Sequence, residues 1–415
     1  MTKGYADFVP IVLGTGLNSY AVARSLHEAF GVRTLAIGRF PLRETADSSI
    51  VDVRSFRDLD RPAKLLEVLE EVAEEFAGRK LLLIANVEYY ISVVIEHRER
   101  LERDFIIPLV SKEVADRLLN KADFYKTCEQ LGVPHPTTRV IGRTEVAAGL
   151  TADLPFDFPV VVKPSDTDVW GRMHFPGKQK VYLATDIHDL QRIADDIYSH
   201  GYADELIVQE YLGGGDSVMR VVNTVSNRDG KMRAISVAQV VLTERNPLTL
   251  GNYNAVVTTS DETLTAQVRH LLDSVGYVGP ANFDIMIDER TGQSKLLEIN
   301  LRLGAASYYA SAAGVNLAEC LVDNFVYELD GVEQISNEQR LWVNVPRWTL
   351  RRFTARDVRP LVAAARRGGV SHTLHYKSDA SASRRYNVFK VSWRHALDLI
   401  RYRKNSELSM EGRPN

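Results

Sequence analysis

The chain has 415 residues, of which 45% are hydrophobic and 25% are charged, a composition that indicates a soluble globular protein of two or three domains. Two cysteines, Cys128 and Cys320, are too few for a disulfide framework or a cysteine-rich zinc site. No apolar run is long enough to span a bilayer, and the first residues lack the pattern of a secretory signal. We therefore expect a cytoplasmic protein with no transmembrane segment.

The net charge of −3 is unevenly distributed along the chain. Residues 340–404 hold 16 lysines and arginines against three acids, a local charge of +13, which leaves −16 for the rest of the chain. Such segregation indicates a surface for anionic partners. It fits equally well a basic segment that packs on the acidic body of its own chain, and the sequence leaves both interpretations open.

The first 112 residues alternate predicted strands and helices. The pattern predicts a buried strand entering a glycine turn (residues 8–16), a helix (19–31), a second strand (33–38), a long amphipathic helix (61–78) and a third strand (80–86). This βαβ order predicts a parallel sheet.

The turn sequence GTGLNS, from Gly14 to Ser19, only partly matches a dinucleotide-binding fingerprint. The third glycine is missing, and the second strand ends in Gly38-Arg39 instead of an acid that could hold a ribose. A nicotinamide-dependent dehydrogenase is therefore the most remote of the functions considered. We interpret the glycines as allowing the turn to approach a neighbouring domain or a substrate closely.

From residue 113 onward the pattern changes. Two helical stretches end at Gly132 and Pro134, and strand-rich segments follow, then a helix (262–276) and a hairpin (281–300) with its turn at Thr291-Gly292. The change to antiparallel strands predicts a domain boundary near residue 112. Beyond about residue 335 the sequence becomes basic and irregular, and we expect the last stretch, residues 405–415, to be disordered.

The hairpin is the first candidate for chemistry. Glu298, Asn300 and Arg302 occupy every second position among apolar residues, so on a strand they share one face, and the hairpin places Asp284 opposite Glu298 and Asn300. Two carboxylates and an amide form an oxygen-only cluster suited to Mg²⁺. The alternative is a solvated sheet face, which the apolar neighbours and Arg302 disfavour.

Two lysines could serve phosphate groups beside such a metal. Lys163 ends the buried apolar strand PVVVKP, and Lys121 opens a helix after the predicted cap Asn120. Alone, each would be an ordinary surface lysine, and only the combination with the metal hairpin makes them candidates.

The segment LIVQEYLGGGDS, residues 206–217, is the last candidate. The extended backbone of Glu210 to Leu212 can pair with the edge of an adenine, and Asp216 can accept ribose hydroxyls, while the glycines permit close approach. By itself the segment would be interpreted as a plain strand followed by a flexible turn.

Taken together in this order, the elements from Lys121 to Gly304 resemble the ATP-grasp superfamily of carboxylate–amine ligases. The resemblance implies an α/β (α+β ATP-grasp) fold. Its expected parts are a Rossmann-like pre-ATP-grasp domain (1–112), an ATP-grasp domain (113–335) with a lid at about 122–208, and a basic C-terminal extension (336–415). It also implies ATP-dependent amide formation through an acyl phosphate.

The resemblance further implies the role of each candidate residue. The bound groups would be ATP and one or two Mg²⁺ ions, with no protein nucleophile. Lys121 and Lys163 would contact the ATP phosphates, and Lys163 would also be catalytic. Gln209, Glu210 and Leu212 would bind the adenine, and Asp216 the ribose. Asp284, Glu298 and Asn300 would bind Mg²⁺, and Arg302 would contact the reacting phosphate or acyl group.

This sequence departs from that superfamily in the loop expected over the phosphates. The loop carries Trp170, Arg172 and His174 where glycines are common. Lys178 or Lys180 can supply the charge that glycine amides supply elsewhere; alternatively, both face solvent. Arg220 and Arg245 are candidates for a substrate carboxylate, each with a structural role as the alternative.

Within the superfamily, residues 160–185 are most similar to the D-aspartate ligases of peptidoglycan assembly. That likeness implies activation of D-aspartate through its β-carboxylate and coupling to the side-chain amine of a stem-peptide lysine on a nucleotide-linked precursor, with no nucleic-acid partner and an undetermined oligomeric state. A ligase for other amino acids or peptides is the nearest alternative, and a non-catalytic ATP sensor is the alternative from another class.

Overall fold

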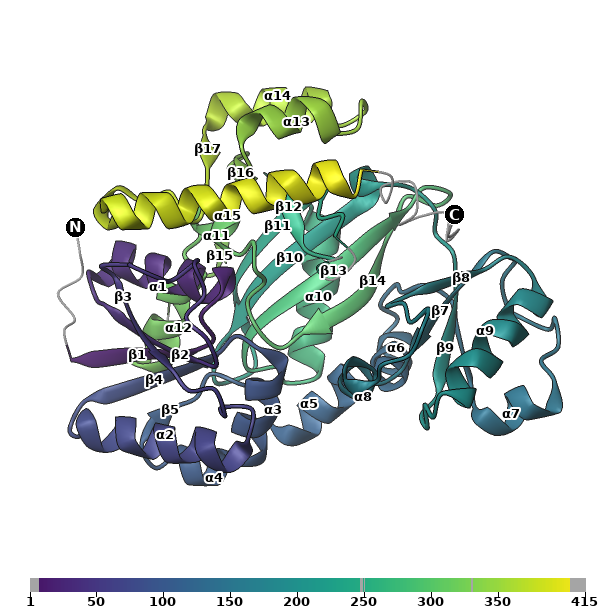
Figure 1. Cartoon of the computed structure of the whole chain (residues 1–415), viewed down its shortest axis with the longest axis horizontal. Coiled ribbons are helices and arrows are strands. Elements are labelled where there is room, and N and C mark those ends of the chain that lie inside the picture. Colours follow the sequence, from purple (N-terminus) through teal and green to yellow (C-terminus); the bar gives the residue numbers. More distant parts are fainter. Residues whose placement is uncertain (1–6, 247–248, 250, 330, 404–415) are drawn as a thin grey trace.

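A computed structural model describes residues 7–246, 249, 251–329 and 331–403, which form three sheets and the helices around them (Figure 1). The N-terminal sheet has five parallel strands in the order β3-β2-β1-β4-β5, which confirms the predicted βαβ pattern. Its elements are β1 (Phe8–Leu13), α1 (Leu17–Phe30), β2 (Thr34–Gly38), β3 (Val51–Ser55), α2 (Pro62–Glu75), β4 (Lys80–Ala85), α3 (Glu88–Glu96), α4 (Arg98–Leu101) and β5 (Phe105–Ile106).

Strand β1 is buried along its whole length. Its Ile11 belongs to the core shared with α2 and α3, and its Val12 to the core shared with α1 and the large sheet. Burial on both faces explains why the strand is an unbroken apolar run instead of an alternating one.

The glycine turn after β1 folds back on its own helix. Gly14 has φ = +131°, and a Cβ placed there would lie 2.7 Å from the Ser19 hydroxyl of α1. The close neighbours are thus side chains of the same domain (Ser19 and Val87), which corrects our expectation that the turn approaches another domain or a substrate.

A small antiparallel sheet with the order β6-β9-β7-β8 forms a separate lobe, on the right in Figure 1. It has its own core around Trp170, Tyr182 and Tyr202. This lobe coincides with much of the predicted lid, whose exact limits stay a prediction. The elements from here on are α5 (Lys112–Leu119), α6 (Lys121–Gln130), β6 (Thr138–Ile141), α7 (Arg143–Ala148), β7 (Val160–Pro164), α8 (Thr167–Arg172), β8 (Tyr182–Ala184), α9 (Ile187–Ser199) and β9 (Leu206–Glu210).

The largest sheet runs β14-β13-β10-β11-β12-β16-β17, with β15 paired to β11. Helix α10 covers one face through Leu264 and Val268, and α12 covers the other through Leu321 and Val322. The elements are a 3₁₀ turn η1 (Asp216–Val218), β10 (Met219–Ser226), β11 (Met232–Thr243), β12 (Tyr253–Thr259), α10 (Glu262–Ser274), β13 (Gly279–Asp288), β14 (Gln293–Asn300), α11 (Tyr308–Ala312), α12 (Leu317–Phe325), β15 (Gln334–Ile335), β16 (Leu341–Val343) and β17 (Val370–Ser371).

The chain after residue 335 is ordered into regular elements, contrary to the irregular structure that we expected. Two of its strands, β16 and β17, extend the large sheet, and its helices are α13 (Arg347–Phe353), α14 (Arg359–Gly368) and α15 (Ala382–Arg401), with a 3₁₀ turn η2 (Lys377–Asp379). Helix α15 packs on the N-terminal domain, where its Val388 and Val391 join a core with Tyr20. The predicted disorder of residues 405–415 lies outside the described residues, and the domain limits at 112 and 335 stay a prediction.

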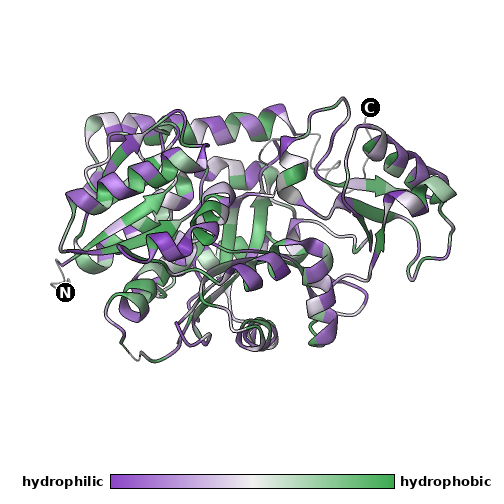
Figure 2. Cartoon of the chain, turned by 90° about the horizontal axis from the view of Figure 1, so that it is seen from below, coloured by the Kyte–Doolittle hydropathy of each residue, from purple (hydrophilic) through white to green (hydrophobic). Residues whose placement is uncertain are grey.

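Hydrophobic residues concentrate in the strands, while the surrounding helices carry mixed faces (Figure 2). Over the part of the chain that the structure describes, no helix combines the length and apolarity needed to cross a membrane.

Candidate active site

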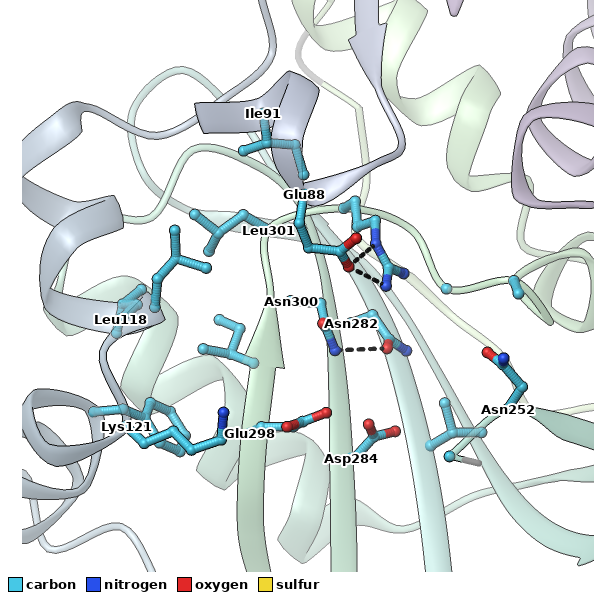
Figure 3. A pocket seen from close by; sticks show the side chains of 18 of the residues that line it. Glu88, Ile91, Leu118, Lys121, Asn252, Asn282, Asp284, Glu298, Asn300 and Leu301 are labelled. Carbon is cyan, nitrogen blue, oxygen red and sulfur yellow. Dashed lines mark hydrogen bonds and ion pairs between the residues drawn. The ribbon is translucent and has the colours of Figure 1, made fainter. Parts of the chain in front are cut away.

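A cavity of about 750 Å³ lies where the large sheet, the start of α6 and the N-terminal domain meet. Its floor is the face of β13 and β14 that carries Asp284 and Glu298 (Figure 3). The polar and charged side chains that line it come from four parts of the chain: Glu88 and Ser92 from α3, Asp116, Asn120 and Lys121 from α5 and α6, Asp166 and Lys180 from the lid, and Asn223, Asn252, Tyr253, Asn282, Asp284, Glu298, Asn300 and Arg302 from the large sheet and its loops.

A β-bulge places the two carboxylates opposite each other. Leu296 pairs with Ile285, yet Glu298 and not Leu297 pairs with Asp284, so one extra residue is accommodated at this point. Beyond the bulge, Asn300 pairs with Asn282 and not with Asp284. The predicted carboxylate pair is therefore confirmed, and Asn300 lies one step further along the same floor (Figure 3).

The bulge is anchored from the lid. The Tyr125 hydroxyl of α6 donates to the Leu297 carbonyl at 2.5 Å, and Lys163 at the end of β7 donates to that hydroxyl at 2.6 Å. Lys163 is buried beneath the ring of Tyr125 and does not itself line the cavity. In this structure Lys163 thus acts on the floor through Tyr125 and through its charge, a connection that the sequence did not predict.

Lys121 occupies the position that the helix start predicts. The Asn120 side chain accepts hydrogen bonds from the backbone N–H groups of Ala122 and Asp123, so it caps α6 as expected. Lys121 therefore lies in the first turn of α6, at the edge of the cavity.

The charged side chains around the cavity floor shift one another's pKa values. Burial raises the pKa of Glu298, but the positive charges of Lys180, Lys121 and Lys163 outweigh it and hold that pKa at about 2. Burial, followed by repulsion from Glu298, raises the pKa of Asp284 to about 7. Burial lowers the pKa of Lys121 and of Lys163 to about 8. The site is thus a desolvated region with a carboxylate pair and three cations around it.

These donors fit a magnesium ion by their chemistry. The described residues hold no group of three or more His, Cys, Asp and Glu side chains that could bind a metal, which disfavours zinc. Two facing carboxylates and an amide oxygen suit Mg²⁺, because that ion keeps several waters and takes further oxygens from substrate phosphates. Asp284, Glu298 and Asn300 are the residues that would hold it.

Arg302 lies two residues past the end of β14 and is bound to a carboxylate. Its Nε donates to Glu88 Oε1 of α3 at 2.7 Å, and its Nη2 contacts the same oxygen. Glu88 is largely exposed, whereas Arg302 is mostly buried at the cavity wall. The guanidinium thus holds a carboxylate oxygen between the large sheet and the N-terminal domain, and its contact with the reacting phosphate or acyl group stays a prediction.

Lys178 is turned into its own loop. Its ammonium donates to the carbonyls of Trp170 and Met173, both at 2.6 Å, and lies over the Trp170 ring. Lys180 lines the cavity instead, and its positive charge contributes most to lowering the pKa of Glu298. The predicted phosphate contact of Lys178 stays a prediction, and Lys180, the alternative, is the one of the two that lines the cavity in this structure.

We expect Lys180→Met to lower kcat for nucleotide-dependent turnover by about a hundredfold, because it removes from the cavity wall the cation with the largest charge effect on Glu298. Lys178→Met should lower kcat only about a few-fold while decreasing the thermal stability of the loop, because its partners are carbonyls of that loop. Lys126→Met, at an exposed position of α6, is the control. A larger loss of kcat in Lys178→Met than in Lys180→Met would contradict the assignment.

The predicted adenine segment lies outside the lining of the cavity. The Glu210 carboxylate accepts from Lys295 at 2.5 Å, from Arg290 at 2.6 Å and from the Thr137 N–H at 2.7 Å, and its own N–H donates to the Thr137 carbonyl. Gln209 donates to the Thr138 hydroxyl. Glu210 thus joins the lid to the β13–β14 hairpin, whereas Gln209 bonds within the small sheet, and adenine contacts by residues 209–212 stay a prediction.

The remaining candidates have partners within the chain. Asp216 accepts from the Thr243 N–H and hydroxyl, so its ribose contact stays a prediction. Half-buried Arg220 donates to the carbonyls of Ser217 and Met219, and Arg245 donates to the carbonyls of Phe353 and Arg403. These bonds favour the structural role for both arginines.

Sequence reasoning missed several polar residues of the floor. Asn223 and Asn282 lie on β10 and β13 in one row with the predicted Asn300 of β14, and the Tyr253 hydroxyl of β12 donates to Asp284. Gly304 packs against this row, since a Cβ there would lie 2.9 Å from the Asn282 amide nitrogen. Only Asn282 carried a signal, because it precedes Asp284 by two positions on one strand.

Comparison with curated proteins gives a relative that aligns over most of both chains. No protein-family model matches the chain. Among curated proteins, the chain is 33% identical over 350 residues to the D-aspartate ligase of Enterococcus faecium (strain Aus0004), an alignment that covers 82% of this chain and 83% of that protein.

Two solved structures share the architecture at low sequence identity. The ADP complex of an N5-carboxyaminoimidazole ribonucleotide synthetase has a TM-score of 0.60 at 13% identity, covering 83% of this chain and 82% of that chain. An L-amino acid ligase from Bacillus licheniformis has a TM-score of 0.55 at 15% identity, covering 80% and 78%. Likeness at these identities shows the fold, which is the one that the sequence predicted.

Proposed function

The chain belongs to the D-aspartate ligase family of ATP-grasp carboxylate–amine ligases, and we propose that it uses ATP to join the β-carboxylate of D-aspartate to an amine. The proposed acceptor is the side-chain amine of a stem-peptide lysine on a nucleotide-linked peptidoglycan precursor. The observation that carries the chemistry is the Asp284–Glu298 pair, which faces a cavity lined by Lys121, Lys180 and Arg302. The 33% identity to a D-aspartate ligase over 82% of the chain supports the choice of donor.

The proposed reaction has two steps that need no protein nucleophile. A carboxylate oxygen of the donor attacks the γ-phosphorus of ATP, the bond to ADP breaks, and an acyl phosphate results. The amine then attacks the acyl carbon, the C–N bond forms, inorganic phosphate leaves, and the nitrogen releases a proton. When bound, Mg²⁺ would neutralise part of the negative charge of the phosphate groups.

The residues of this chain serve the first step mainly by electrostatics. Lys121 and Lys180 bring positive charge to the cavity wall, and the burial of Lys121 makes its interactions stronger than in water. Lys163 adds its charge from behind Tyr125 and steadies the bulge that presents Glu298. Phosphoryl transfer depends chiefly on such positioning and charge stabilisation.

Arg302 is placed for the donor side of the reaction. Its guanidinium already holds the carboxylate of Glu88 at the cavity wall, so it can exchange that partner for a carboxylate or acyl phosphate of the substrate. The amide row of Asn223, Asn282 and Asn300 offers both donors and acceptors beside it. A donor with two carboxylates and an ammonium, such as aspartate, matches this mixture of groups.

We expect release of inorganic phosphate when the protein is incubated with ATP, Mg²⁺, D-aspartate and the nucleotide-linked precursor. L-aspartate is the matched control, since it differs in configuration alone, and reactions without donor or acceptor set the background. Mass spectrometry of the precursor should show the added aspartyl residue. Turnover with a different amino acid and none with D-aspartate would overturn the donor and keep the ligase class.

A further inference from the structure

The outward side of α15 carries a continuous apolar stripe. Tyr386, Phe389, Trp393, Leu397 and Ile400 recur every three or four residues, so they share one face of the helix, and all five are exposed, Phe389 by 57% and Leu397 by 56%. We call these five residues the α15 stripe. Trp348 of α13 extends it, with its ring centroid 6.3 Å from that of Trp393. A patch of this kind on one helix indicates an interaction surface.

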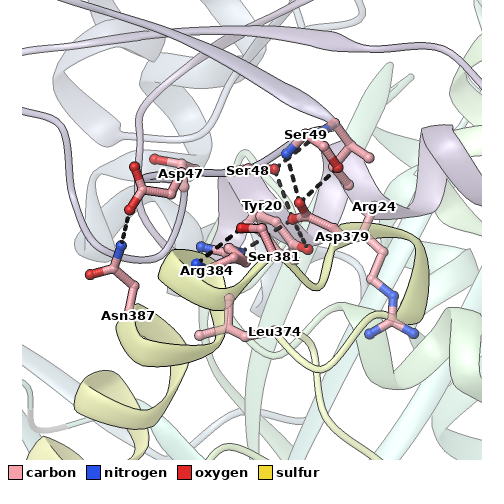
Figure 4. A network of polar contacts seen from close by, with 12 residues as sticks. Tyr20, Arg24, Asp47, Ser48, Ser49, Leu374, Asp379, Ser381, Arg384 and Asn387 are labelled. Carbon is pink, nitrogen blue, oxygen red and sulfur yellow. Dashed lines mark hydrogen bonds and ion pairs between the residues drawn. The ribbon is translucent and has the colours of Figure 1, made fainter.

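The stripe is presented by a firmly attached helix. The inward residues of α15, among them Val391, Ala396 and Leu399, are buried. Its first turn is held by Arg384, which is fully buried and donates to backbone carbonyls of residues 43, 44 and 46 in the N-terminal domain (Figure 4). The apolar stripe is thus the outer surface of a folded element.

Basic residues border the stripe on both sides. Helical spacing places Lys390, Arg394 and Arg401 along one border and Arg385 on the other. Arg394 pairs with Glu44, whereas Arg385, Lys390 and Arg401 have no carboxylate partner among the described residues. The single acid of α15, Asp398, accepts a hydrogen bond from the Asn246 amide through its carboxylate.

The charge of the C-terminal region therefore has two parts. Two of the α15 cations are neutralised by acids of the same chain: Arg384 pairs with Asp379, and Arg394 pairs with Glu44. This pairing does not account for the unpaired cations at the borders of the stripe. These cations give the surface beside the stripe a positive potential that favours an anionic partner.

We propose that the α15 stripe docks on a membrane surface that contains anionic phospholipids. Aromatic and aliphatic side chains in the centre with lysine and arginine at the edges match the headgroup boundary, where rings and alkyl groups enter the acyl region and cations meet phosphates. Helix α15 is not apolar enough to cross a bilayer, so it lies in the plane of the surface. A second copy of the chain is a poorer partner, because a two-fold contact brings identical basic borders together.

The first test is co-sedimentation of the full chain with vesicles of phosphatidylcholine alone or of phosphatidylcholine and phosphatidylglycerol in equal parts. We expect binding to the anionic vesicles that weakens as salt is raised. Of the four tryptophans, Trp170 and Trp342 are buried while Trp348 and Trp393 are exposed. Brominated lipids should therefore quench emission from the exposed pair, and Trp393→Phe should remove much of that quenching.

Variants of the stripe and of its borders separate the two contributions. Phe389→Ser with Leu397→Ser should weaken vesicle binding by about tenfold or more, because two apolar groups that would enter the acyl region are lost. Lys390→Glu with Arg401→Glu should abolish the preference for anionic vesicles. Val332→Ser, at another exposed apolar position, and Arg103→Glu, at an exposed position next to α4, are the controls. Circular dichroism and ligase turnover with soluble substrates verify that each variant is folded.

Two outcomes would overturn the proposal. One is equal sedimentation of the wild type with and without anionic vesicles. The other is a dimer in light scattering that Phe389→Ser with Leu397→Ser dissociates while vesicle binding is absent; the stripe would then be an interface between copies. Because vesicle binding needs no ATP or amino acid, the proposal stands or fails independently of the ligase reaction.

Discussion

Replacing Glu298 by glutamine should reduce ligation by about a thousandfold or more, since it removes a charge from the centre of the site while preserving the shape of the side chain. Glu298 faces Asp284 across the bulged hairpin and is the carboxylate on which the charges of Lys180, Lys121 and Lys163 converge. The glutamine amide carries no negative charge, so Mg²⁺ loses one charged ligand. Lys180, Lys121 and Lys163 also lose the negative charge of Glu298. We expect the loss in kcat, because the charges of the transferred phosphoryl group develop during the reaction.

The measurement is phosphate release at saturating ATP and donor, together with ATP affinity by titration. Glu289→Gln, at an exposed position in the turn of the same hairpin, is the matched control and should retain wild-type turnover. A non-catalytic ATP sensor would have no turnover in the wild type and only weaker ATP binding in Glu298→Gln. Wild-type turnover in Glu298→Gln would refute the role of the carboxylate pair.

Replacing Arg384 by methionine should lower the free energy of unfolding by about 3–5 kcal/mol, because it leaves a buried carboxylate without its cation. Arg384 is fully buried, forms an ion pair with Asp379 at 3.2 Å, and lies over the ring of Tyr20 (Figure 4). Asp379 also accepts from Tyr20 at 2.7 Å and from the Ser49 N–H at 2.6 Å. This network joins the C-terminal region to the N-terminal domain.

The adjacent Arg385 provides a close control. It is exposed and lacks a carboxylate partner among the described residues, so Arg385→Met should change stability by about 0.5 kcal/mol or less. Thermal and urea unfolding followed by circular dichroism compare the two variants. Combining Arg384→Met with Asp379→Leu should recover part of the loss, because the unpaired charge disappears. Equal stability of Arg384→Met and Arg385→Met would show that the network contributes little.

The N-terminal sheet and the hairpin could be predicted because their signals are local. An apolar run of strand length between glycine turns, followed by a helix, predicts a parallel strand wherever it occurs. The turn at Thr291-Gly292 is likewise local, and in the structure Gly292 has φ = +72°. The cap at Asn120 depends on two backbone N–H groups within three residues.

Helix α15 was missed for a reason that the structure makes clear. A helix is recognised by one apolar face, whereas α15 is apolar inward, through Val388, Val391 and Leu399, and again outward along the stripe. Its buried Arg384 further obscures the pattern, because arginine is rarely buried unless paired. The paired Asp379 lies in a different element, η2, and the carbonyl partners lie in the N-terminal domain.

The sequence by itself determined the parallel N-terminal sheet, the hairpin with Asp284 opposite Glu298, and the family resemblance, since each depends on neighbouring residues or on the order of motifs. Only the tertiary structure decided that a bulge at Leu297, held by Tyr125, brings that pair into register, and that Lys180 reaches the cavity while Lys178 binds its own loop. Such outcomes depend on which carbonyls and side chains distant segments bring within hydrogen-bonding distance. No local periodicity encodes that choice.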